Sequence, residues 1–166
     1  PAGALAIDAL KDFSKREIRG KSVVAIVSGG NFDFERLPDV KERVDLYFEH
    51  AEKAKEQIKR CTKVYGNLAV LDLRYEETIY AVNRFMIYAL FPETNISIHL
   101  MWGVQKQNTV FATGKSIVNR SSNTNVGELM LFYGGGGHEN AGTCQIANDR
   151  ADVVLKELVT NINADG

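Results

Sequence analysis

A glycine-rich motif followed by a histidine is the strongest chemical signal in this sequence, and its residues are Gly134, Gly135, Gly136, Gly137, His138, Ala141 and Gly142. Glycine loses more conformational freedom on folding than any other residue, so the run indicates a place where the backbone approaches another group closely. Consecutive unobstructed N–H groups form an anion-binding nest, and a nearby helix start adds positive potential. His138 could donate a hydrogen bond to a phosphate oxygen or carry a proton near neutral pH. A flexible glycine turn followed by a surface histidine is the alternative interpretation.

A second polar cluster, Arg120, Ser121 and Ser122, follows an expected strand. The planar guanidinium of arginine suits phosphate, and the two serines are small hydrogen-bond donors. Taken alone, the cluster is typical of a strand end with a solvated arginine. It lies about 14 residues before the glycine motif, with one short helix expected between them, so both clusters can face one pocket. The sequence therefore predicts a local anion site built from these two segments.

Three runs within these segments carry a resemblance to a known family: K-S-I-V-N-R-S-S, N-V-G-E-L and Y-G-G-G-G-H-E-N-A-G. They resemble the C-terminal substrate-binding domain of the DHH phosphoesterase superfamily, which includes exopolyphosphatase-like proteins, oligoribonucleases and cyclic-dinucleotide phosphodiesterases. The resemblance covers about residues 49–166. It implies that Arg120, Ser121, the four glycines and His138 hold the phosphates of a substrate. The run Ala141-Gly142-Thr143 departs from the many members that have a further alanine before the glycine.

Catalysis in that superfamily depends on a separate N-terminal domain, in which Asp and His ligands hold two divalent ions that activate water. This sequence contains neither an Asp-His-His nor an Asp-x-Asp pattern. We therefore expect no catalytic residue and no metal ligand here, and manganese would belong to a missing catalytic domain. Whether the chain is an enzyme stays open at this point, and we expect little activity from the chain alone.

The first 46 or so residues carry a different resemblance. P-A-G-A-L, V-V-A-I-V-S-G-G-N and Glu42-Arg43 resemble the end of a threonine dehydratase catalytic domain. In those pyridoxal-phosphate enzymes the serine of S-G-G-N faces the pyridine nitrogen, a role that would map to Ser28. The Schiff-base lysine and the cofactor-phosphate loop lie far upstream in such enzymes, so we do not expect pyridoxal phosphate to bind. The chain is then a chimera, natural or engineered, unless the S-G-G-N match is a coincidence.

Hydrophobic periodicity predicts an α/β fold, with a mixed β-sheet that has helices on both faces. The expected helices are 4–19, 38–61, 76–90, 125–132 and 150–162, and the expected strands are 22–28, 68–73, 96–102, 109–116 and 142–147. The sequence divides into a segment 1–48, which resembles the lyase, and a phosphate- or nucleotide-binding domain 49–166.

One long central helix, at about 38–61, carries an apolar seam at heptad spacing: Val40, Val44, Tyr47, Ala51, Ala54, Ile58 and Cys61. An exposed seam of this length needs a partner. We favour packing across the sheet, over the strands 22–28 and 68–73, because small residues such as Ala51 and Ala54 suit a flat surface. A monomer is therefore expected, and a homodimer through this helix is the alternative.

The charge balance excludes a protein that binds nucleic acid over its whole surface, because 20 Lys and Arg residues stand against 21 Asp and Glu residues. Cys61 and Cys144 lie far apart and are typical of a reducing compartment. The N-terminus shows no secretion signal, and no stretch suits a membrane span. These features favour a cytoplasmic location and no membrane partner.

Three functions remain open. The first is a phosphate- or nucleotide-binding module whose partner is a phosphorylated ligand, a short oligonucleotide or polyphosphate. The second is a DHH-family phosphoesterase, an exopolyphosphatase or oligonucleotide hydrolase. The third is an engineered chimera that retained no function. A glycine nest recognises phosphate and not base, so the sequence does not select one ligand.

Overall fold

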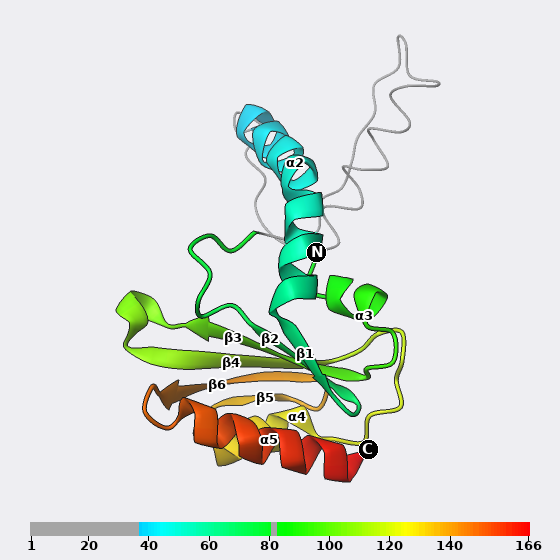
Figure 1. Ribbon diagram of the computed structural model, residues 1–166, viewed down its shortest axis with the longest axis vertical. Helices are drawn as coiled ribbons and strands as arrows, with labels where there is room; N and C mark the ends of the chain where they lie inside the picture. Colours follow the sequence, from blue (N-terminus) through cyan, green and yellow to red (C-terminus); the bar gives the residue numbers. More distant parts are fainter. Residues whose placement is uncertain (1–36, 81–82) are drawn as a thin grey trace. The chain divides into compact units, whose positions relative to one another are not determined.

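The computed structural model describes residues 37–80 and 83–166 of the chain (Figure 1). The chain divides into two units, Pro1–Asp45 and Leu46–Gly166. The helix expected at 4–19, the strand expected at 22–28 and Ser28 lie outside the described residues. None of the helices within the described part is long and apolar enough to cross a membrane.

Within the described residues, six strands form one mixed sheet in the order β1-β2-β3-β4-β6-β5. Their bounds are β1 Thr62–Tyr65, β2 Leu68–Asp72, β3 Ile96–Trp102, β4 Asn108–Lys115, β5 Gly136–His138 and β6 Ala141–Ala147. The β2–β3 pair is parallel and the other four pairs are antiparallel. The predicted α/β class with a mixed sheet is therefore confirmed. The sequence-based reading missed two short strands: β1, whose last three residues are exposed, and β5, which lies in the glycine motif.

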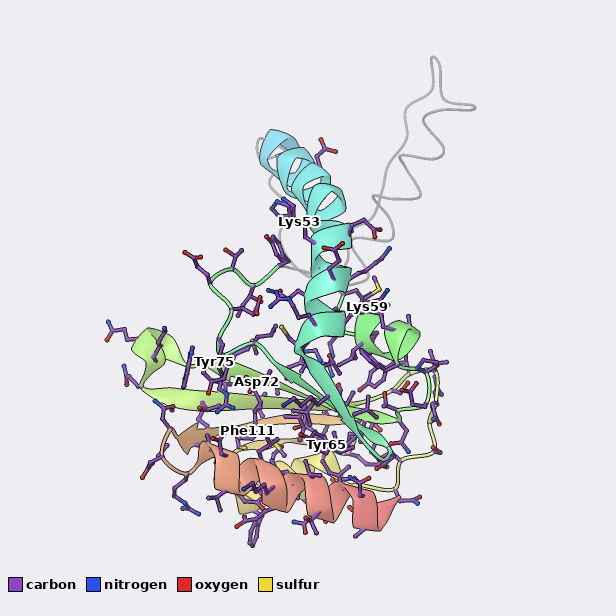
Figure 2. All side chains as sticks on the ribbon, viewed as in Figure 1. Lys53, Lys59, Tyr65, Asp72, Tyr75 and Phe111 are labelled. Carbon is purple, nitrogen blue, oxygen red and sulfur yellow. The ribbon has the colours of Figure 1, made fainter. Side chains whose placement is uncertain are left out.

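Helices α4 (Val126–Phe132) and α5 (Ala151–Asp165) cover one face of the sheet (Figure 1). The buried residues of α5 recur at intervals of three and four: Ala151, Val154, Leu158 and Ile162. They pack against alternate strand residues such as Ile98 and the fully buried Phe111, which is labelled in Figure 2. Both helices occur where the periodicity predicted them, and α5 continues three residues further, to Asp165.

The opposite face carries the end of α2 (Leu37–Cys61) and α3 (Met86–Leu90). A second core cluster joins Ile58 of α2 to Leu71 of β2 and to Ile87 and Tyr88 of α3. Helices on both faces were predicted, and so was the long helix at 38–61. Of its seam, Ala54 and Ile58 are buried while Ala51 and Cys61 are half-buried. The side chains of Val40, Val44 and Tyr47 and the strand 22–28 lie outside the description, so the monomer and its dimeric alternative stay predictions.

The predicted helix at 76–90 is wrong over most of its length, because only Met86–Leu90 is helical among its described residues. The buried side chain of Gln57 donates to Glu76 Oε2 at 2.8 Å and to the carbonyl of Thr78 at 2.7 Å. It also accepts the backbone N–H of Tyr80 at 3.2 Å. A side chain from α2 thus satisfies backbone groups that a helix would pair internally. Tertiary contacts override the local periodicity here.

Two connections between neighbouring strands are tight turns. Gly66, with a φ of +59°, joins β1 to β2, a backbone angle that few side chains tolerate. A 3₁₀ turn, Val104–Lys106, lies between β3 and β4.

Candidate ligand-binding site

A cavity of about 320 Å³ lies on the sheet face opposite α4 and α5. Ser97 and His99 of β3 line it, and they alternate with Ile96, Ile98 and Leu100, which belong to the core under α4 and α5. Because successive strand residues point to opposite faces, Ser97 and His99 point away from that core. The polar side chains of β3, which take no part in the core under α4 and α5, therefore face the cavity.

Small residues line the cavity on this face of the sheet, among them Ala112 and Gly114 of β4. A Cβ atom at Gly114 would collide with Nη2 of Arg84, so the guanidinium lies directly against the glycine backbone. Arg84 is the one cationic side chain among the described residues that line the cavity. An anion entering the cavity would meet this guanidinium, which offers a planar set of donors.

His99 is half-buried, and burial is the main cause that lowers its pKa from 6.5 to about 4, with the nearby charge of Arg84 as a second cause. The imidazole is therefore neutral at pH 7. A neutral imidazole has one N–H donor and one nitrogen acceptor. His99 thus adds hydrogen-bonding capacity of both kinds to the cavity without adding charge.

The lowered pKa of His99 predicts that stability falls as the pH falls from 6.5 towards 4. The unfolded chain binds the proton in this range while the folded protein does not, so protonation favours unfolding. Urea unfolding at pH 4.5, 5.5 and 7 measures the effect, and His99→Gln should weaken the pH dependence. Glu76, whose pKa is lowered from 4.5 to about 2, chiefly by hydrogen bonds from Arg60, adds to the loss of stability only near and below pH 4.5, and this part is the same in His99→Gln. An unchanged pH dependence in His99→Gln would contradict this expectation.

The four glycines of the sequence motif divide into two pairs with different tasks. The N–H groups of Gly134 and Gly135 donate to the carbonyls of Leu131 and Met130, both at 2.9 Å, and Gly134 has a φ of +77°. This is a Schellman motif that caps the C-terminus of α4. The expected nest of four free N–H groups is therefore wrong for this pair, because both groups are used by the helix.

The second pair, Gly136 and Gly137, lies in the edge strand β5 and lines the cavity, as do Ala141 and Gly142 of the neighbouring strand β6. Gly137 and Gly142 are directly opposite each other in the ladder. Four residues predicted from the sequence are thus brought together around one cavity.

His138 ends β5 and is exposed, opposite Ala141 in the ladder. Its Nδ1 accepts the backbone N–H of Asn140 at 3.2 Å. In the neutral form the proton is then on Nε2, which is left as a donor. His138 is not among the residues that line the cavity.

The Arg120 cluster lies in the connection after β4 and is likewise not part of the cavity lining. Arg120 is exposed, and its Nε donates to the carbonyl of Ile117 at 3.1 Å. The hydroxyl of Ser121 accepts from Asn95 Nδ2 at 2.9 Å, while the buried hydroxyl of Ser122 has no hydrogen-bond partner among the described residues. A role for Arg120, Ser121 and Ser122 in phosphate binding stays a prediction.

Sequence reasoning missed Arg84, Ser97 and His99. The signal for the latter two was present, because both are polar residues that alternate with isoleucine and leucine in a strand. Arg84 lies in a segment expected to be helical, and no local pattern indicated that it would reach Gly114.

The described residues contain no group of three or more His, Cys, Asp or Glu side chains that could hold a metal ion. They therefore do not fit the two-ion centre that the sequence resemblance assigns to a separate catalytic domain.

Comparisons with known proteins divide between two families, and no family model matches the chain. The biosynthetic L-threonine dehydratase IlvA of Staphylococcus aureus is 49% identical over 49 residues, which are 30% of this chain and 11% of that protein. The enzyme of the same name from Halalkalibacterium halodurans is 53% identical over 47 residues, 28% of this chain and 11% of that protein. The predicted resemblance of a short N-terminal stretch is confirmed.

Among solved structures, the pGpG-specific phosphodiesterase PggH from Vibrio cholerae is 61% identical with a TM-score of 0.76. The match covers 96% of this chain and 50% of that chain, so the chain spans half the length of PggH. An exopolyphosphatase-related protein from Bacteroides fragilis shares the fold, with a TM-score of 0.55, 18% identity and coverage of 76% and 39% of the two chains. The predicted resemblance to DHH-family phosphoesterases is confirmed.

Proposed function

We propose that this chain, similar to DHH-family phosphoesterases, contributes a ligand-binding domain that holds a short phosphorylated oligonucleotide in the cavity on the open sheet face. One observation carries the proposal. Arg84 and four residues predicted from the sequence, Gly136, Gly137, Ala141 and Gly142, line the same cavity. A guanidinium binds phosphate oxygens with parallel hydrogen bonds, and glycines permit close approach to the backbone.

Three features favour a nucleotide over a bare phosphate. The cavity volume of about 320 Å³ is within the usual range for small-molecule sites. Its lining combines one cation with the neutral groups Ser97 and His99, which suit a ligand that is charged at one end. PggH is described as pGpG-specific, and the match to this chain covers half of the length of PggH.

Hydrolysis is the second candidate, and the 61% identity to PggH, a phosphodiesterase, favours it. In the superfamily that the sequence resembles, that reaction requires divalent ions, which Asp and His residues of a catalytic domain hold. The described residues of this chain would then bind and orient the substrate, and the metal-activated water would be supplied elsewhere.

The test is a binding measurement by calorimetry with the dinucleotide pGpG and with tripolyphosphate, each at two salt concentrations. We expect pGpG to bind weakly, with an affinity that falls as salt rises, because phosphate contacts release counterions. If the chain binds neither pGpG nor tripolyphosphate, the proposal is contradicted. Cleavage of pGpG by the purified chain with added manganese, above a blank, would favour the second candidate over simple binding.

Two variants test the residues chosen from the sequence. Arg120→Ala and His138→Ala should each weaken pGpG binding, because each removes a donor that the family resemblance places on phosphate. If both variants bind pGpG as tightly as the parent, those two residues do not belong to the site. The cavity residues would then have to carry the binding alone.

A further inference from the structure

The wall of the cavity contains a hydrogen-bonded chain that begins at Tyr88 of α3. The hydroxyl of Tyr88 is buried and contacts two groups, the hydroxyl of Ser97 at 2.8 Å and the carbonyl oxygen of Gly114. Ser97 and Gly114 both line the cavity. The chain therefore connects the second core cluster to the ligand space.

The direction of each hydrogen bond follows from counting protons. A carbonyl oxygen can only accept, so Tyr88 donates its single proton to Gly114. Burial raises the pKa of Tyr88, which keeps that proton in place at neutral pH. The contact between Tyr88 and Ser97 then needs a donor, and the proton of Ser97 is the one that remains. With its proton committed to Tyr88, the Ser97 hydroxyl has only lone pairs left to offer.

We infer that Ser97 Oγ is a specificity-determining acceptor, which receives an N–H group from the base of the bound nucleotide. This inference rests on the proposed function, since it concerns the same cavity. A phosphate group presents only acceptor oxygens at this point, so it gains nothing from Ser97 and is directed to Arg84 instead. A base edge with N–H donors, as guanine has, pairs with the lone pairs of Ser97.

His99 complements this arrangement from the same face of β3, two residues further along. Its neutral imidazole can meet either a donor or an acceptor on the base. Ser97 can meet only a donor, because it donates its single proton to Tyr88, which the ligand does not displace. Ser97 is therefore the group that discriminates between base edges, and His99 is the adaptable one.

The experiment compares pGpG with a methylated dinucleotide in which methyl groups replace every N–H hydrogen of both guanines. In the unaltered protein we expect the methylated probe to bind about tenfold or more weakly, the effect of one lost hydrogen bond to a buried partner. Ser97→Ala should reduce this difference to about threefold or less, whereas Ser97→Thr, which keeps the hydroxyl, should retain it. A purely steric effect of the methyl groups would persist in Ser97→Ala and would overturn the inference.

Tripolyphosphate is the control ligand, because it has no base and should bind the parent and Ser97→Ala equally. Equal binding of pGpG and the methylated probe by the unaltered protein would overturn the role of Ser97 even if Ser97→Ala failed to fold. It would leave the proposed function intact, because pGpG would still bind. If the unaltered protein binds neither pGpG nor tripolyphosphate, the proposed function itself is overturned.

Discussion

Gly137→Ala is expected to destabilise the protein by about 1–3 kcal/mol and to lower its melting temperature by about 5 °C or more. A Cβ atom at Gly137 would collide with the carbonyl oxygen of Ala141 and the Cα of Gly142, which are backbone atoms of the paired strand β6. Backbone atoms held in a ladder cannot swing aside as a side chain can. The strand β5 would have to separate from β6, and thermal unfolding followed by circular dichroism measures the cost.

Gly136→Ala is the matched control for this prediction. A Cβ atom at Gly136 would meet no atom of the described residues within 4 Å, and the backbone angle of Gly136 is outside the left-handed region. We expect a melting temperature within about 2 °C of the parent, as for substitutions without steric conflict. Because Gly136 lines the cavity, the added methyl group should weaken pGpG binding without affecting stability. Equal stability losses in both variants would show that β5 and β6 are not paired as described.

Arg84→Gln is expected to weaken pGpG binding about tenfold or more, since a hydrogen bond to a charged group contributes roughly 1.5–3 kcal/mol. Glutamine is polar but uncharged and shorter than arginine, so the change removes the charge and the planar set of donors that reach the cavity. The slope of log affinity against log salt should also decrease in magnitude by about one, as expected for the loss of one phosphate contact. Calorimetry at several salt concentrations gives both quantities in one series.

Lys156→Gln provides the control for charge alone. Lys156 is exposed on α5, which covers the opposite face of the sheet. Its replacement removes one positive charge far from the cavity, and we expect pGpG affinity to stay within about twofold. If Lys156→Gln weakens binding as much as Arg84→Gln does, the ligand responds to net charge and Arg84 makes no specific contact.

The elements with a strong hydrophobic period were the ones that the sequence predicted correctly. Helix α2 follows an apolar repeat across most of its length, and β3 alternates between apolar and polar residues up to Leu100. The segment 76–90 has no comparable constraint, and Gln57 holds its first residues in an irregular conformation. That side chain is about 20 residues away in the sequence, so no local pattern contains the information.

The candidate site shows the same division. The glycine motif could be recognised because four glycines in succession are costly unless close approach requires them. Its division into a helix cap and an edge strand depends on where α4 ends and on how β6 pairs, neither of which the motif encodes. Arg84 reaches the cavity because Gly114, 30 residues later, has no Cβ.

The sequence by itself determined the fold class, the long helix, most of the strands and the segment that carries Gly136 and Gly137. These follow from side-chain periodicity and from backbone freedom, which are properties of neighbouring residues. The tertiary structure decided which groups share the cavity and which way the Tyr88 and Ser97 hydroxyls donate. Those properties arise from strand order and from packing between α3 and β3, because hydrogen-bond direction is set by partners that only the folded chain brings together.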